Sequence, residues 1–203
     1  MKPLTLVILS LLFITFTANA QNIIKKTPKL KYTKQLTVEV GGEIFLSSTN
    51  GTRTEFGNER GYGTETFFTL KAGAGIFVIN GLKLGIEPAV SIHFYDSDNR
   101  WTQLKLYFTP EYVLNTKTIV FPYLGASIGY TSSNYSYSVG SSPNMDGIGY
   151  GAKAGLRVNL FGNSLLNFGF AYNRENYNYT ASYGDVKQRY DVFGMTLGWS
   201  VFF

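Results

Sequence analysis

Apolar and polar residues alternate along most of the chain from residue 36 onward. In the first alternating stretch, leucine, valine and isoleucine occupy even positions and are separated by threonine and glutamate. Successive side chains of a β-strand point to opposite faces, so each such stretch predicts a strand with one apolar face. The stretches with this pattern are residues 36–46, 68–78, 82–94, 104–114, 120–130, 148–160, 166–172 and 193–203. The sequence therefore predicts eight strands.

The connections between these predicted strands alternate in length. Tight turns are predicted at Asn80-Gly81, residues 115–118 and Gly162-Asn163, and an Asn-Gly pair between alternating stretches is a strong hairpin signal. Long loops are predicted at the other end, at residues 49–63, 132–147 and 173–186. We therefore expect an antiparallel up-and-down sheet with both chain ends on the short-turn side, as in transmembrane β-barrels.

The distribution of glycine predicts which face of the barrel points inward. Twelve strand glycines share the parity of the charged residues, whereas only Gly42 has the apolar parity. Side chains just fill the bore of an eight-stranded barrel, so small residues must make room for large ones there. Aromatic residues of apolar parity near the strand ends fit two interfacial girdles: Phe94, Tyr130, Tyr150 and Tyr172 on the loop side, and Tyr112, Trp199 and Phe203 on the turn side. We predict charges inside and apolar residues outside, and not a secreted barrel with an apolar interior.

The first 35 residues differ from the rest of the chain. The apolar run of residues 4–16 follows Lys2 and leads to Ala18 and Ala20, which fit a signal-peptidase cleavage site. The run is too short to span a bilayer, so we expect residues 1–20 to be a signal peptide. Residues 21–35 contain five lysines and no acid, and we expect a flexible basic arm. Residues 36–203 are then the barrel domain.

Composition excludes several classes of function. The 203 residues include no cysteine, which excludes disulfides and thiolate sites. The basic excess lies in the predicted arm, so nucleic-acid binding is not expected. The segment Asp96-Ser97-Asp98-Asn99 lacks the glycine and the glutamate of a calcium loop, and Gly147-x-Gly149-x-Gly151 begins a strand. We predict neither a metal nor a cofactor.

The end of the chain carries the most specific pattern. Alternating apolar residues run up to a terminal aromatic: Phe193, Met195, Leu197, Trp199, Val201 and Phe203. With its eight strands, residues 36–203 resemble the small outer-membrane β-barrels of Gram-negative bacteria, the OmpA/OmpX type. The resemblance implies an all-β transmembrane barrel in outer-membrane lipid, whose last residues Trp199, Val201 and Phe203 are read by the barrel-insertion machinery. We expect a monomer.

The inward parity carries equal numbers of acidic and basic residues. They are Glu39, Glu43, Glu65, Glu87 and Glu111, with Lys71, Lys83, Lys105, Lys153 and Arg157. Buried charges need partners, so we predict a salt-bridge network that fills the bore. Opening of these pairs would instead give a narrow conduit for small or hydrophobic solutes. Eight strands exclude free diffusion of the kind seen in sixteen-stranded porins.

The resemblance indicates a compartment better than an activity, because such barrels serve as anchors, adhesins, conduits or lipid-modifying enzymes. Histidine catalysis would need His93 with Ser91, but same-face neighbours on a strand lie about 7 Å apart, too far for a hydrogen bond. We predict no enzymatic activity. Tyrosine-rich segments at residues 134–137 and 176–179 suggest a surface partner. A structural or surface-interaction role is therefore predicted.

Three prolines fit the barrel poorly. Pro88, Pro110 and Pro122 have the apolar parity of neighbouring strands. Proline cannot donate a ladder hydrogen bond, and a closed barrel has no edge strand to tolerate the loss. Either the prolines lie near the rim, or they weaken one part of the wall.

Overall fold

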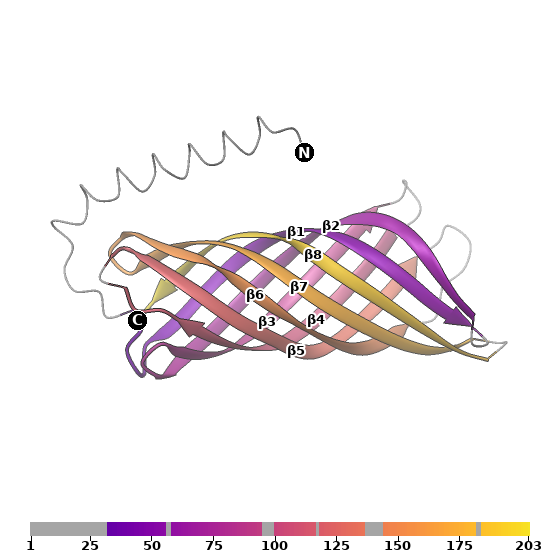
Figure 1. Ribbon diagram of the computed structural model, residues 1–203, viewed down its shortest axis with the longest axis horizontal. Helices are drawn as coiled ribbons and strands as arrows, with labels where there is room; N and C mark the ends of the chain where they lie inside the picture. Colours follow the sequence, from indigo (N-terminus) through magenta and orange to yellow (C-terminus); the bar gives the residue numbers. More distant parts are fainter. Residues whose placement is uncertain (1–31, 56–57, 95–99, 117, 137–143, 182–183) are drawn as a thin grey trace, which may run out of the picture.

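The structure, a computed structural model, describes residues 32–55, 58–94, 100–116, 118–136, 144–181 and 184–203. Its strands are β1 (Val38–Glu55), β2 (Asn58–Ile79), β3 (Leu82–Phe94), β4 (Arg100–Val113), β5 (Val120–Ser136), β6 (Met145–Phe161), β7 (Ser164–Ala181) and β8 (Gly184–Phe202). They form one closed barrel in chain order (Figure 1). The predicted all-β, eight-stranded antiparallel architecture is confirmed. Within these residues, no helix is long and apolar enough to cross a membrane.

Each strand pairs with the next one along the chain, and β8 closes the barrel against β1. The closing register runs from Glu39 opposite Phe202 to Glu55 opposite Val186. Closure matters because a membrane offers no water to satisfy unpaired backbone groups at a sheet edge.

Two predicted tight turns have the expected geometry. Gly81 and Gly162 adopt positive φ angles of 87° and 56°. Glycine enters this region without the steric cost that a side chain brings. The Gly81 carbonyl also accepts a hydrogen bond from the backbone N–H of Val113, 2.7 Å away, which ties the first turn to the end of β4.

The prediction of long loops is wrong for most of their length, because strand pairing continues into those segments. The hairpins β1–β2 and β7–β8 are paired up to Glu55–Asn58 and Ala181–Gly184. They reach farthest at the end opposite the C-terminus (Figure 1). β2 has 22 residues, which at a 45° tilt rise about 50 Å, roughly twice the apolar band of such barrels. Outside the lipid the outer face of the barrel need not be apolar. The alternation of apolar and polar residues therefore ends there, although the pairing of the strands continues.

The predicted orientation of the two faces is confirmed. Charged residues of the inward parity, such as Glu111 and Lys153, are buried. The outer face exposes a belt of large apolar side chains, including Val40, Leu46, Leu70, Ile86, Leu104, Leu124, Ile128, Phe170 and Leu197. Exposed aromatic rings at both ends of this belt include Tyr130, Tyr150 and Tyr172 on the loop side, and Tyr112, Trp199 and Phe203 on the turn side.

Two of the three prolines coincide with gaps in the ladder of the described strands. The β2–β3 register has partners at Lys71–Ala89 and Ala74–Ile86 but none at Pro88 between them. The β4–β5 register likewise skips Pro110, between Phe108–Ile128 and Glu111–Gly125. Pro122 causes no such gap, since it pairs with Leu156 and its carbonyl accepts the Leu114 N–H at 2.8 Å. Pro88 and Pro110 therefore interrupt the wall locally.

Candidate functional site

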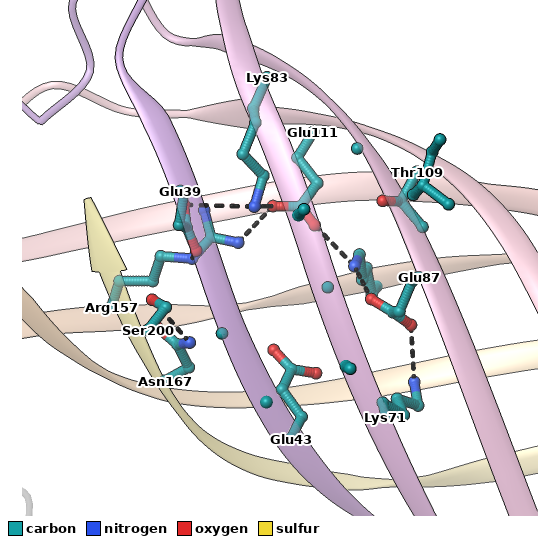
Figure 2. A pocket seen from close by; sticks show the side chains of 18 residues that line it. Glu39, Glu43, Lys71, Lys83, Glu87, Thr109, Glu111, Arg157, Asn167 and Ser200 are labelled. Carbon is teal, nitrogen blue, oxygen red and sulfur yellow. Dashed lines mark hydrogen bonds and ion pairs between the residues drawn. The ribbon is translucent and has the colours of Figure 1, made fainter. Parts of the chain in front are cut away.

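The barrel interior holds an ion-pair network centred on Glu111 of β4 (Figure 2). Its carboxylate lies 3.0 Å from Nζ of Lys83 and 2.6 Å from Nζ of Lys153, and it also pairs with the guanidinium of Arg157. The three cations come from β3 and β6, so the network joins strands from different parts of the wall. Only 2% of Glu111 is exposed, so water compensates little of its charge.

The cations of this network are shared between carboxylates. Lys83 Nζ lies 3.2 Å from Glu39 as well as contacting Glu111. Lys153 Nζ lies 2.8 Å from Glu87 as well as contacting Glu111. A buried carboxylate is tolerated when several donors surround it, and this sharing supplies them.

Aromatic rings add to the charge compensation at two positions. Lys71 Nζ lies 3.2 Å from Glu87 and 4.5 Å from the centroid of the Phe45 ring. The Arg157 guanidinium lies 4.5 Å from the centroid of the Tyr123 ring. Both are cation–π geometries, which are strongest where water is excluded.

The structure brings most of the predicted interior charges together, with three exceptions. Seven of them form the central network: Glu39, Lys71, Lys83, Glu87, Glu111, Lys153 and Arg157. Lys105 belongs to a separate cluster nearer the loop end. Glu43 forms no ion pair with the described side chains. The Glu65 side chain lies outside those described, although its backbone pairs with Thr49.

The cluster around Lys105 contains residues that the sequence analysis missed. Lys105 Nζ lies 2.5 Å from Glu175, whose carboxylate also accepts hydrogen bonds from the hydroxyls of Tyr107 at 3.2 Å and Tyr177 at 2.9 Å. Glu175 and Tyr177 were placed in a predicted surface loop, yet both point into the bore and are fully buried. The alternation from Ala171 onward, continued past the apolar belt, would have shown their inward parity.

Tyr32 closes the turn end of the bore. Its ring packs between Phe77, Phe121 and Phe202, with centroids 5.1–5.2 Å apart. Its hydroxyl donates to Glu39 at 2.5 Å and accepts from Arg157 at 2.8 Å. Tyr32 is 0% exposed. The structure thus differs from the predicted flexible arm at this residue, because an aromatic ring with hydrogen-bonding partners gains more from burial than the arm's lysines would.

A second aromatic layer closes the loop end. The Trp101 ring lies 4.9 Å from that of Phe67 and 5.0 Å from that of Tyr190, and Tyr190 lies 5.8 Å from Tyr177. The Trp101 indole N–H donates to Ser133. Phe67, Trp101 and Tyr177 are buried. The described bore therefore has aromatic rings at both ends and charged residues between them.

The network leaves one small cavity that Glu43, Asn167 and Ser200 help to line (Figure 2). Its volume of about 30 Å³ is room for about two water molecules. The described residues offer no group of three histidine, cysteine or acidic side chains that could hold a metal ion. This cavity can hold water or a small ion.

Other residues singled out from the sequence are placed as follows. The Ser91 hydroxyl lies 2.6 Å from that of Thr69, while the His93 side chain is outside the described ones. Trp199 and Phe203 are exposed on the outer face, and Val201 between them is half-buried. Ala18 and Ala20 lie outside the described residues.

Comparisons with known proteins show the class of fold. No family model matches the chain, and no curated protein does. Neisserial surface protein A matches with a TM-score of 0.50 and 17% identity, covering 77% of this chain and 96% of that one. OprG from Pseudomonas aeruginosa matches with a TM-score of 0.55 and 13% identity, covering 84% of this chain and 97% of that one. AlkL, solved in lipid bilayers, matches with a TM-score of 0.54 and 16% identity, covering 88% of this chain and 95% of that one. The chain has the fold of small eight-stranded outer-membrane β-barrels.

Proposed function

We propose that the protein is an integral outer-membrane barrel whose role is structural or interactive at the cell surface, exerted by its protruding hairpins. The observation that carries this proposal is the filling of the bore, with the ring of Tyr32 near one end, that of Trp101 near the other and paired charges between them. A bore so filled does not serve free diffusion, which leaves the outer faces and ends of the barrel for function.

Membrane insertion is supported by the outer surface. The exposed apolar belt and the flanking aromatic rings suit lipid, and most charged residues are buried in the interior, away from the lipid-facing surface. We assign residues 1–20 to export and the exposed Trp199 and Phe203 to recognition by the insertion machinery. The barrel is proposed to be monomeric, because its wall is complete without a second chain.

The surface role rests on the hairpin ends that rise beyond the apolar belt. Tyr177 is buried in the bore and is withdrawn from the predicted contact surface. Exposed charged side chains remain there, with Arg60 and Lys187 on the two farthest hairpins, and Arg189 paired with Glu59 at 3.1 Å. A partner would meet arginine, lysine and acidic groups at this end.

The absence of cysteine allows a direct test of this topology. Single variants Arg60→Cys and Lys187→Cys would report the long-hairpin end, and Asn163→Cys, in the β6–β7 turn, would be the matched control. A membrane-impermeant maleimide added to whole cells should label the first two and not the third. Labelling of Asn163→Cys alone would contradict the proposed orientation.

Unchanged lipid A mass on expression would support a role without lipid modification.

A narrow conduit is a second candidate, favoured by the ladder gaps at Pro88 and Pro110. The cavity lining includes Ala72, Gly73 and Glu87, which flank the first gap. Single-channel recording in planar bilayers separates the two candidates. A closed barrel should show no discrete conductance, and reproducible openings of wild-type protein would favour the conduit.

A further inference from the structure

Glu43 is the exception in an interior where other described acids have cationic partners. It faces Lys71 directly across the β1–β2 register, yet Lys71 Nζ pairs with Glu87 on β3 instead. The Oε2 atom of Glu43 is buried and accepts no hydrogen bond from the described residues. Figure 2 shows the Glu43 side chain pointing into the cavity, without a dashed contact. An ionised carboxylate in this position lacks a direct counter-charge.

Two further oxygen atoms on the same side of the barrel have no hydrogen-bond partner in the described structure. They are Oδ1 of Asn167 on β7 and Oγ1 of Thr196 on β8. Asn167 is 2% exposed and lines the cavity. Its Nδ2 donates to Ser200 at 3.2 Å, so its amide is anchored at the nitrogen and leaves the oxygen as a free acceptor. An unsatisfied buried acceptor is costly, and a bound species would relieve that cost.

Gly198 brings these groups together. It lies directly opposite Glu43 in the β1–β8 register and directly opposite Asn167 in the β7–β8 register. A Cβ at position 198 would lie 2.5 Å from Cγ of Glu43, so the Glu43 side chain occupies the space that the glycine leaves. The Glu43 side chain therefore lies against Gly198, and Asn167 is paired with the same glycine from the other side of β8. Thr196 is the next inward-facing residue on β8, and its Oγ1 would lie 3.0 Å from a Cβ at position 169 of β7.

We infer that Glu43 and Asn167, which both line the cavity, form a binding site for a monovalent cation of the size of sodium, with Thr196 as the next inward-facing residue on β8 and water in the cavity completing the shell. Carboxylate, amide and hydroxyl oxygens are ligands for hard cations, and the oxygen atoms of Glu43, Asn167 and Thr196 named above have no hydrogen-bond partner in the described structure. The cavity of about 30 Å³ has room for about two waters to complete the shell.

The surrounding charges favour a single positive charge over a double one. When Glu43 is counted with the charges of the central network and of the Lys105 cluster, five acids face five bases: Glu39, Glu43, Glu87, Glu111 and Glu175, with Lys71, Lys83, Lys105, Lys153 and Arg157. This balance leaves little excess negative charge for a divalent ion, and one carboxylate is the only charged ligand. A monovalent cation adds the smallest net charge to the interior and neutralises the charge of the Glu43 carboxylate.

The site is tested by thermal unfolding of the folded, detergent-solubilised protein in sodium chloride and in N-methylglucamine chloride at equal ionic strength. The bulky organic cation cannot enter the cavity. At a tenfold excess over the dissociation constant, sodium should raise the unfolding midpoint by about 3–6 °C relative to N-methylglucamine. Glu43→Gln should abolish this difference, while Glu59→Gln, on an exposed carboxylate, should preserve it. Equal midpoints of the wild-type protein in both salts would overturn the site and leave water as its occupant.

A second measurement keeps the inference testable if Glu43→Gln fails to fold. Crystals of the wild-type protein soaked in thallium acetate should show an anomalous peak beside Oε2 of Glu43 and Oδ1 of Asn167. The Asn167→Asp variant, with a second carboxylate, should bind thallium more tightly, with at least a tenfold lower half-saturating concentration. Peaks only at the protein surface would contradict the assignment.

Discussion

Glu111 offers the sharpest test of the interior network. The substitution Glu111→Gln keeps the shape of the side chain and removes its charge. The wild-type carboxylate is shared by Lys83, Lys153 and Arg157, and each of these cations would lose one of its partners. Lys83 would keep Glu39, and Lys153 would keep Glu87, so the remaining carboxylates would be left to compensate for more charge.

The size of the effect follows from the burial of these groups. Breaking one buried pair by removing a partner costs about 3–5 kcal/mol, mainly because a buried charge is left uncompensated. Glu111 is 2% exposed, so water cannot replace it. For a domain of this length, such a loss lowers the unfolding midpoint by about 6–20 °C. The upper part of the range is expected, because more than one cation is affected.

The assay is thermal unfolding in detergent micelles, followed by tryptophan fluorescence. The matched control is Glu59→Gln, which breaks the exposed pair with Arg189 and should cost about 0–1 kcal/mol. Added salt should reduce the difference in unfolding midpoint between the wild type and Glu59→Gln, because salt screens exposed ion pairs. It should not reduce the difference in unfolding midpoint between the wild type and Glu111→Gln, since buried pairs are poorly screened. Equal destabilisation by the two substitutions would refute the view that Glu111 compensates the buried positive charge of Lys83, Lys153 and Arg157.

Three further outcomes are expected. Deleting Phe203, the exposed terminal aromatic, should lower outer-membrane assembly, and wild-type yield of a heat-modifiable band would argue against its role as an assembly signal. Replacing Pro88 and Pro110 with valine should slow amide exchange around residues 72–73 and 126–127, whereas uniform protection in the wild-type wall would show that the ladder gaps are not weak points. Tyr32→Ala should remove the ring between Phe77 and Phe121 and admit water, seen as faster exchange at the turn end, with Tyr112→Ala on the outer face as the control.

Within the apolar belt, the sequence predicts the structure well, because lipid imposes a strict rule on the outer face. Each outward position there must be apolar, so a period of two marks both the strand and its orientation. The crowded bore adds a second constraint, which is visible in the inward glycines. Gly198 shows it directly, since any Cβ there would collide with the Glu43 side chain.

The sequence does not predict which of the interior charges contact one another. Parity places Lys71 and Glu43 opposite each other, but it does not tell which acid Lys71 contacts. A long flexible side chain in a narrow bore can reach across to a neighbouring strand, and Lys71 binds Glu87 in this way. The choice depends on the summed geometry of several strands, which no local pattern contains.

Glu175 illustrates the remaining limit, at the point where the barrel leaves the lipid. There both faces of β7 are polar, because water surrounds the wall outside and charges fill it inside. The hydrophobic signal for a strand disappears, although hydrogen bonding between β7 and β8 continues to Ala181–Gly184. In a polar segment that stays paired, inward and outward positions continue to alternate as they do in the part of the strand within the apolar belt. Counting by two from Ala171, an inward residue within the apolar belt, brings Asn173, Glu175 and Tyr177 into the bore, and all three are buried. The two tyrosines of this segment, Tyr177 and Tyr179, therefore have the inward parity, whereas Asn176 and Asn178 between them have the outward one, because a single strand divides its residues between the two faces.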